Sequence, residues 1–234
     1  NLQNIPVRTE VGHEIRSTFV ASPEADGLLT ADYSQIEMRI MAHLSEDSGL
    51  IEAFQGGEDL HRFVGARIFD CTPEDVTALM RTKVKAMSYG LAYGLSAYGL
   101  AQQLAISPSE AKELMSEYFR RFGNVRDYLR TVVTKASQDG FTETLFGRRR
   151  PFPDLASPNR IVREAAERQA LNAPIQGTAA DIIKIAMRDI SVDIAGSGLQ
   201  SRMILQVHDE LVFDVFQGER EALESIVVTR MGGA

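Results

Sequence analysis

The stretch RMILQVHDELVFDV at residues 202–215 decides the fold. Two runs rich in branched and aromatic side chains meet at the polar pair His208-Asp209, which is typical of a β-hairpin. A second apolar run, LLTADYS at residues 28–34, ends on an acid and predicts a strand that enters a loop. Helical patterns fill most of the chain between these strands. The order predicts an α+β fold, in which a small antiparallel sheet carries a large, mostly helical insertion.

The helical part contains recognisable starts and breaks. Helix starts are predicted at Thr72 and at Ser107, because each is a capping residue followed by a proline. The stretch 109–138 predicts a long amphipathic helix with a break near Gly123. Further on, the pattern is helical on both sides of Pro174.

Composition limits the class of protein. The 234 residues fit one large domain or two subdomains, and a hydrophobic fraction of 44% is ample for a core. No apolar run is long enough to cross a membrane, and no signal-peptide pattern begins the chain. The single cysteine, Cys71, cannot form an internal disulfide and is expected to be an inert thiol in a reducing compartment.

Charge is unevenly distributed along the chain. The net charge of −7 by itself argues against a partner with a phosphate backbone. However, residues 148–168 carry six arginines against three acids. This segregation permits a basic channel on an acidic body, while the alternative is an ordinary solvated helix face.

Acidic residues stand where the predicted strands end. Asp32 closes one strand, and Asp209 and Glu210 lie at the tip of the hairpin. If the two elements pair in one sheet, Asp32 and Asp209 approach each other and repel unless a cation lies between them. Two Mg²⁺ ions about 3.5–4 Å apart could then clamp a displacement at phosphorus. The simpler alternatives are a turn acid at Asp209 and a helix N-cap at Asp32.

One predicted helix carries an unusual stripe. In RTKVKAMSYGLAYG, residues 81–94, two cations and two tyrosines recur every four residues and form one slanting row: Arg81, Lys85, Tyr89 and Tyr93. Cations can bind a triphosphate, and aromatic faces can contact a base or sugar. The alternative is an exposed basic turn that runs into buried tyrosines.

Six ordered motifs resemble those of family A DNA polymerases, the group of the bacterial DNA polymerase I. Three are the polymerase motifs DYSQIEMRI (32–40), R-x3-K-x3-Y-G-x2-Y-G (81–94) and VHDE (207–210). The others are NLQNIPVRTEVGHEIRSTF (1–19), DLH (59–61) and RQALNAPIQGTAADIIK (168–184). The resemblance covers essentially the whole chain. It implies a right-hand architecture in which residues 1–40 and 169–234 form the palm and residues 41–168 form most of the fingers.

The resemblance also implies roles for single residues. Asp32 and Asp209 match the metal-binding aspartates, Glu210 matches a supporting acid, and the backbone carbonyl of Tyr33 matches a further metal ligand. The resemblance also implies that Lys85 is catalytic, together with Asp32, Asp209 and Glu210. The residues that match the nucleotide site are Gln35, the steric gate Glu37, His61, Arg81, Lys85 and Tyr89. Those that match contacts to primer–template DNA are Tyr93, Arg168, Asn172, Gln176 and His208.

The implied function is DNA-directed DNA synthesis. The enzyme would add dNMPs to a primer 3′-hydroxyl with two Mg²⁺ ions, or Mn²⁺ in their place, in gap filling during DNA repair and replication. Its partners would be primer–template DNA and dNTPs, and we expect a monomer with thumb and nuclease domains in a longer parent chain. The bacterial cytoplasm, at the nucleoid, is the expected location, with mitochondria as the alternative. Tyr89, where many relatives have Phe, predicts weak discrimination against dideoxynucleotides relative to a Tyr89→Phe variant.

Three competing interpretations remain. A single-subunit RNA polymerase shares the palm acids, but Glu37 as a gate argues against it. A catalytically dead nucleic-acid-binding relative would not need to keep both aspartates together with Arg81 and Lys85. A purely structural helical module would need neither acids at strand ends nor a cationic stripe.

Overall fold

The computed structural model describes residues 5, 9–57 and 59–234, so most of the first eight residues of the N-terminal motif lie outside it. The chain forms two compact units. The sheet unit comprises Asn1–Ile36 and Ala179–Ala234, and the helical unit comprises Glu37–Thr178. The assignment of residues 1–40 and 169–234 to a palm, and of 41–168 to fingers, stays a prediction.

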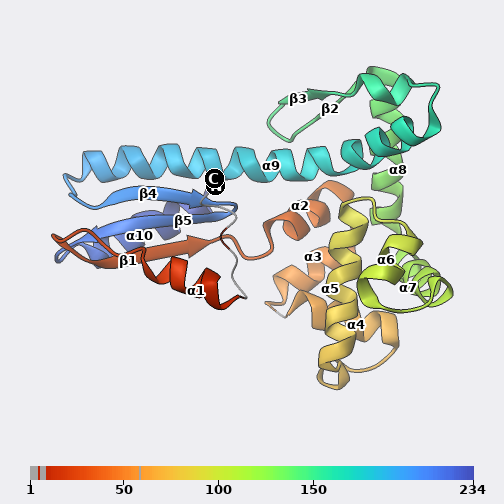
Figure 1. Cartoon of the computed structure of the whole chain (residues 1–234), viewed down its shortest axis with the longest axis horizontal. Helices are drawn as coiled ribbons and strands as arrows, with labels where there is room; N and C mark the ends of the chain where they lie inside the picture. Colours follow the sequence, from red (N-terminus) through yellow and green to blue (C-terminus); the bar gives the residue numbers. More distant parts are fainter. Residues whose placement is uncertain (1–4, 6–8, 58) are drawn as a thin grey trace. The chain divides into compact units, whose positions relative to one another are not determined.

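The sheet unit contains a three-stranded antiparallel sheet (Figure 1). Its strands are β1 (Ala25–Asp32), β4 (Arg202–Val207) and β5 (Glu210–Phe216), in the order β1-β5-β4. The predicted strand and hairpin are therefore confirmed. The short helix α1 (Glu10–Ser17) precedes the sheet, and α10 (Arg220–Gly232) follows it.

One core holds the sheet unit together. Ile190 in the second half of α9 (Arg160–Gly196), Phe213 on β5 and Leu223 on α10 are all fully buried in the same cluster. Removing such side chains from water contributes about 1.5–3 kcal/mol each. The sheet is thereby anchored by its central strand, and its edge near Asp32 and Asp209 has a firm support.

The helical unit is built from short helices and one long one (Figure 1). Its helices are α2 (Ile36–Ser45, with Ile36 still in the sheet unit), α3 (Ser48–Gln55), α4 (Leu60–Phe69), α5 (Ala78–Ala92), α6 (Ala97–Leu104), α7 (Pro108–Arg121) and α8 (Gly123–Asp139). The small hairpin of β2 (Phe141–Glu143) and β3 (Arg149–Pro151) and the turn η3 (Pro153–Ala156) lead into α9 (Arg160–Gly196). The break at Gly123 and the start at Ser107 are confirmed, and α9 continues unbroken through Pro174.

The predicted helix start at Thr72 opens a 3₁₀ helix, with Thr72 at the N-cap position and a proline at the first position, and no α-helix begins there. Only a single 3₁₀ turn, η2 (Pro73–Asp75), follows it. The Thr72 hydroxyl donates to the Asp75 carboxylate at 2.9 Å and accepts no backbone N–H of the turn. The helix α5 begins five residues later, where the Thr77 hydroxyl accepts the backbone N–H of Met80 at 3.2 Å.

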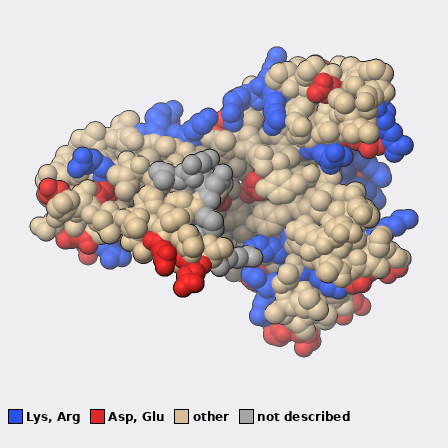
Figure 2. All heavy atoms as spheres, in the orientation of Figure 1, with Lys and Arg blue, Asp and Glu red and all other residues tan. Residues whose placement is uncertain are grey.

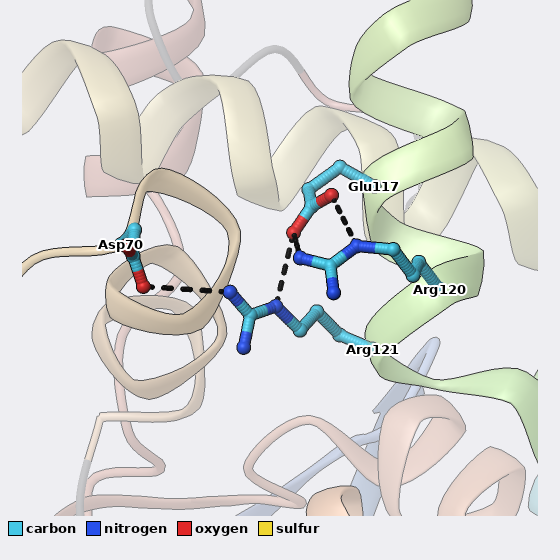
Figure 3. Close-up of polar contacts among 4 residues, drawn as sticks. All are labelled: Asp70, Glu117, Arg120 and Arg121. Carbon is cyan, nitrogen blue, oxygen red and sulfur yellow. Dashed lines mark hydrogen bonds and ion pairs between the residues drawn. The ribbon is translucent and has the colours of Figure 1, made fainter.

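A surface ion network joins α4 to α7 (Figure 3). Glu117 accepts hydrogen bonds from Arg120 at 2.8 and 2.5 Å and from Arg121 at 2.9 Å. Arg121 also reaches Asp70, at the end of α4, at 3.4 Å. The two guanidinium groups lower the pKa of Glu117 to about 2. The network is exposed, so it fixes geometry more than it adds stability.

The fold class is the predicted α+β. Within the part of the chain that the structure describes, no helix has the length and apolar character needed to span a membrane.

Candidate functional site

The pairing of β1 with β5 brings the predicted acids together in the sheet unit. Asp32 stands opposite Glu210 in the register, and the backbone N–H of Tyr33 donates to the carbonyl of Asp209 at 3.3 Å. Partial desolvation and the negative charge of Asp209 raise the pKa of Asp32. The two carboxylates therefore share one sheet edge, as the sequence predicts, and they repel each other there.

This edge fits a hard divalent cation. Among the described residues, no group of three His, Cys, Asp or Glu side chains lies close enough to hold a metal. Mg²⁺ needs no such cage, because it binds one or two carboxylates and fills the remaining positions with waters and substrate phosphates. A cation between Asp32 and Asp209 would also relieve their repulsion.

The phenol of Tyr33 is committed elsewhere. Its hydroxyl donates to the carbonyl of Met231 on α10 at 2.8 Å, and burial raises its pKa to about 12. The side chain is therefore uncharged and connects the acidic edge to α10 through this hydrogen bond. The role of the Tyr33 backbone carbonyl as a metal ligand, which the resemblance implies, stays a prediction.

Two predicted site residues beside the acids have left-handed backbones. Gln35 has φ 57° and His208 has φ 56°, which is uncommon for residues other than glycine. In addition, Oε1 of Gln35 is buried and has no hydrogen-bond partner among the described residues. Strained backbone and unsatisfied buried polar atoms concentrate at functional sites, because a ligand can complete them.

In the helical unit, α4 and α5 gather the predicted phosphate-binding residues. Burial lowers the pKa of His61 to about 4, and the charges of Arg81 and Lys85 add to the shift while Asp59 opposes it. The ring of His61 lies 6.0 Å from that of Tyr89, and its Nδ1 has no hydrogen-bond partner within the described part of the chain. His61 is thus a neutral, buried imidazole beside two cations.

Sequence reasoning missed the role of Asp59. It belongs to the DLH motif, but only His61 was assigned there. The carboxylate caps α4 and also accepts from Nε and Nη2 of Arg81 at 3.1 and 2.7 Å. An aspartate directly before a helix start signals a cap, whereas its contact with Arg81 arises only from tertiary packing.

The last member of the stripe leaves the helix. α5 ends at Ala92, two residues before the predicted end near Gly94, and Tyr93 is its C-cap. The Tyr93 hydroxyl donates to Oε2 of Glu37 at 2.6 Å. Burial and then Glu37 raise the pKa of Tyr93 to about 12, so the phenol stays protonated. The predicted gate and the predicted template aromatic are therefore in direct contact.

Predicted DNA-contacting residues of the helical unit line one open cavity. Its volume is about 890 Å³, and Tyr93, Arg168 and Asn172 are among its lining residues. Gln176 hydrogen-bonds the Tyr93 hydroxyl, and Oδ1 of Asn172 is buried without a partner among the described residues. Four of the five predicted DNA contacts thus gather in this unit, and the fifth, His208, lies in the sheet unit.

The arginine-rich stretch forms an exposed surface that is partly neutralised from within. Figure 2 shows Lys and Arg side chains over the β2–β3 hairpin. Arg149 donates to Glu143 at 2.8 Å, and Arg150 lies 5.1 Å over the ring of Phe152. Arg160 pairs with Glu164 at 2.6 Å. The stretch therefore combines the two alternatives: a basic surface whose charges are in part paired.

Comparison with known proteins agrees with this geometry. The family model "DNA polymerase family A" matches residues 1–234. DNA polymerase I of Mycobacterium tuberculosis (strain H37Rv) is 63% identical over 234 residues, and that of Geobacillus stearothermophilus is 51% identical over 228 residues. These alignments cover 100% and 97% of this chain but 26% of each relative, so the chain spans about a quarter of their length.

A solved structure is also similar. It is described as the POL domain of Pol1 from M. smegmatis in complex with DNA primer-template and dNTP. The match has a TM-score of 0.96 at 64% identity, and it covers 100% of this chain and 41% of that chain. With a family model that matches its whole length, the chain belongs to DNA polymerase family A.

Proposed function

We propose that this chain carries the catalytic residues of a DNA-directed DNA polymerase, which adds dNMPs to a primer 3′-hydroxyl and releases pyrophosphate. The observation that carries the proposal is the meeting of Asp32 and Asp209 at one sheet edge, from opposite ends of the chain. Family membership and the similarity to a polymerase domain described with primer-template and dNTP support it.

The acidic edge would hold the divalent ions. Asp32, Asp209 and the backbone carbonyl of Tyr33 would be ligands for two Mg²⁺ ions, or Mn²⁺, with Glu210 in support. When bound, such ions supply charge neutralisation for both the attacking and the leaving oxygen. The chain itself contributes the positions of the carboxylates and the rigid sheet behind them.

The cations of α5 would bind the triphosphate, beside the neutral His61 of α4. Phosphoryl transfer depends on positioning and on neutralising charge, which Arg81 and Lys85 supply through N–H donors. His61 is neutral at physiological pH, so it would add a hydrogen bond and no charge. Glu37, held by Tyr93, would lie where a ribose 2′-hydroxyl must be excluded.

Uncharged side chains would check the base pair. Asn172 and Gln176 can donate to minor-groove acceptors, which differ little between base pairs. Tyr93 and Arg168 line the same cavity as Asn172 and would contact the template or primer terminus. Contacts of this kind test the shape of a pair without reading its sequence.

The wider setting rests on the relatives. They are bacterial DNA polymerases I, so we infer a role in gap filling during DNA repair and replication, as a monomer at the bacterial nucleoid. The parent chain would also contain thumb and nuclease domains.

Primer extension by the complete gene product tests the proposal. With Mg²⁺ and dNTPs, Asp209→Ala and Asp32→Asn should each lose about 10³-fold or more in rate, because metal-assisted charge stabilisation contributes several kcal/mol. The matched control is Asp26→Asn, since Asp26 lies on the same strand but accepts from Gly218 N–H at 3.1 Å. Extension that survives Asp209→Ala would remove the metal assignment, and efficient use of rNTPs would favour an RNA polymerase.

A further inference from the structure

Asp59 is the carboxylate that contacts both phosphate-binding elements of the helical unit. We propose that Asp59 is a positioning residue that orients Arg81 for the triphosphate of the incoming nucleotide. The inference rests on the proposed polymerase function. It adds to that function a residue that touches neither substrate nor metal.

The two oxygens of Asp59 have separate tasks. Oδ1 accepts the backbone N–H groups of His61 and Arg62 at 2.9 and 3.0 Å, and so caps α4. Oδ2 accepts from Nε and Nη2 of Arg81 on α5 at 3.1 and 2.7 Å. The Asp59 side chain thereby fixes both the start of α4, which carries His61, and the guanidinium group of Arg81 on α5.

This contact restricts how Arg81 can present its donors. A guanidinium has five N–H groups in a rigid plane, and Asp59 engages the edge formed by Nε and Nη2. The remaining donors, chiefly those of Nη1, therefore point in one direction while the pair holds. Such pre-organisation reduces the conformational entropy lost when the arginine binds a phosphate.

The exposure of the pair argues for orientation over stability. The side chains of Arg81 and Asp59 are 41% and 33% exposed, and ion pairs this open to water add little to folding. Partial burial raises the pKa of Asp59, but the hydrogen bonds from Arg81 and Arg62 outweigh this effect and keep the pKa below its usual value. Asp59 is thus charged, and Arg81 held, throughout the neutral range.

A competing role for Asp59 has the opposite sign. If the carboxylate merely competed with the triphosphate for Arg81, its removal would tighten nucleotide binding. If it positions Arg81, its removal weakens binding. The direction of the change in KM for dNTP therefore decides between the two roles.

The test is Asp59→Asn in the complete gene product. The amide oxygen can keep both bonds to α4, because Asn is a good N-cap, whereas the NH₂ group cannot accept from Arg81. We expect KM for dNTP, and the equilibrium dissociation constant of dNTP, to rise about fivefold to tenfold, as for a partly lost charge-assisted contact. The value of kcat should stay within about twofold.

Two further variants make the result specific. Lys83, another cation of α5, donates to Glu110 at 2.6 Å. Glu110→Gln removes the negative charge of this pair and should leave nucleotide binding unchanged. In an Arg81→Ala background, Asp59→Asn should have no additional effect, because the contact is already absent. If Asp59→Asn lowers the melting temperature, Asp59→Ser, which also caps a helix without charge, should still show the KM effect.

Several outcomes would overturn the inference. A lower KM in Asp59→Asn would establish competition, and an unchanged KM, or an equal rise in the Arg81→Ala background, would exclude action through Arg81. A wild-type protein that extends no primer would instead refute the proposed function itself.

Discussion

One hydrogen bond at residue scale fixes the predicted gate. The Tyr93 hydroxyl donates to Oε2 of Glu37 at 2.6 Å, and a bond to a charged acceptor is stronger than one between neutral groups. Glu37 lies in the first turn of α2 and Tyr93 caps α5. The position of the gate carboxylate therefore depends on an aromatic side chain from another element.

Tyr93→Phe should weaken selection against ribonucleotides. It deletes the hydroxyl and frees Glu37, and losing a hydrogen bond to a charged group costs about 1.5–3 kcal/mol. We expect the ratio of kcat/KM for dNTP over rNTP to fall about tenfold in single-nucleotide incorporation. Tyr98→Phe, at a side chain 67% exposed on α6, is the matched control. An unaltered ratio in Tyr93→Phe would show that Glu37 needs no such support.

His61 should make stability depend on pH. Its pKa of about 4 in the folded chain lies below the ordinary value, so only the unfolded chain binds this proton between about pH 6.5 and 4. The free energy of unfolding should therefore fall as the pH drops through this window, by about 2 kcal/mol at pH 5, and the loss should vanish above pH 6.5. Urea unfolding of His61→Gln and His61→Phe should both lack this contribution. A wild-type slope in both variants would contradict it.

At the scale of elements, the β2–β3 hairpin is hydrogen-bonded to α9 next to Gln176. The backbone N–H of Leu145 donates to Oγ1 of Thr178 at 3.1 Å, and Nη2 of Arg148 donates to the carbonyl of Gly177 at 2.8 Å. A Cβ on Gly177 would lie 2.6 Å from Cγ2 of Thr144. Thr144 cannot rotate away freely, because its Oγ1 accepts the amides of the following turn at 3.2 and 3.3 Å.

Gly177→Ala should therefore push the β2–β3 hairpin away from α9. The clash should cost about 1–3 kcal/mol relative to Gly196→Ala, a change in the same helix whose added Cβ meets nothing within 4 Å. Thermal unfolding compares the two variants directly. Because Gln176 adjoins Gly177, affinity for primer–template DNA should also fall in Gly177→Ala and persist in Gly196→Ala. Equal melting temperatures in the two variants would show that the hairpin can shift away from the added methyl group without a loss of stability.

The sequence predicted the secondary-structure elements better than the side-chain contacts between them. Apolar, β-rich runs placed Asp32 at a strand end and Asp209 at a hairpin tip, whereas the pairing of β1 with β5 is seen only in the structure. The cap of α4 was visible in the letters of DLH, but the bond from Asp59 to Arg81 depends on how α4 packs on α5. The pattern at Thr72 predicted a helix start but not its extent, because a proline after a capping residue also suits a single 3₁₀ turn.

At the scale of the whole molecule, the two units differ in how the chain builds them. The central strand β5 pairs with β1 along its whole length, from Ala25 opposite Phe216 to Asp32 opposite Glu210. The sheet unit thus needs both ends of the chain. The helical unit is continuous, and its cluster of Ala136, Phe152, Leu155, Ala166, Ala170 and Ala173 lies entirely within it.

Residues 37–178 should therefore fold as an isolated fragment, because their core closes without the remaining chain. Far-UV circular dichroism should show a helical fragment that melts cooperatively. The fragment 37–159 is the matched control, since it lacks the part of α9 that supplies Ala166, Ala170 and Ala173 to this cluster, and it should melt at a lower temperature than 37–178. The fragment 179–234 should stay unfolded until a peptide of residues 20–36 restores β1. Cooperative melting of 179–234 alone would show that the sheet unit does not need β1. Absence of cooperative melting in 37–178 would show that the helical unit does not fold without the rest of the chain.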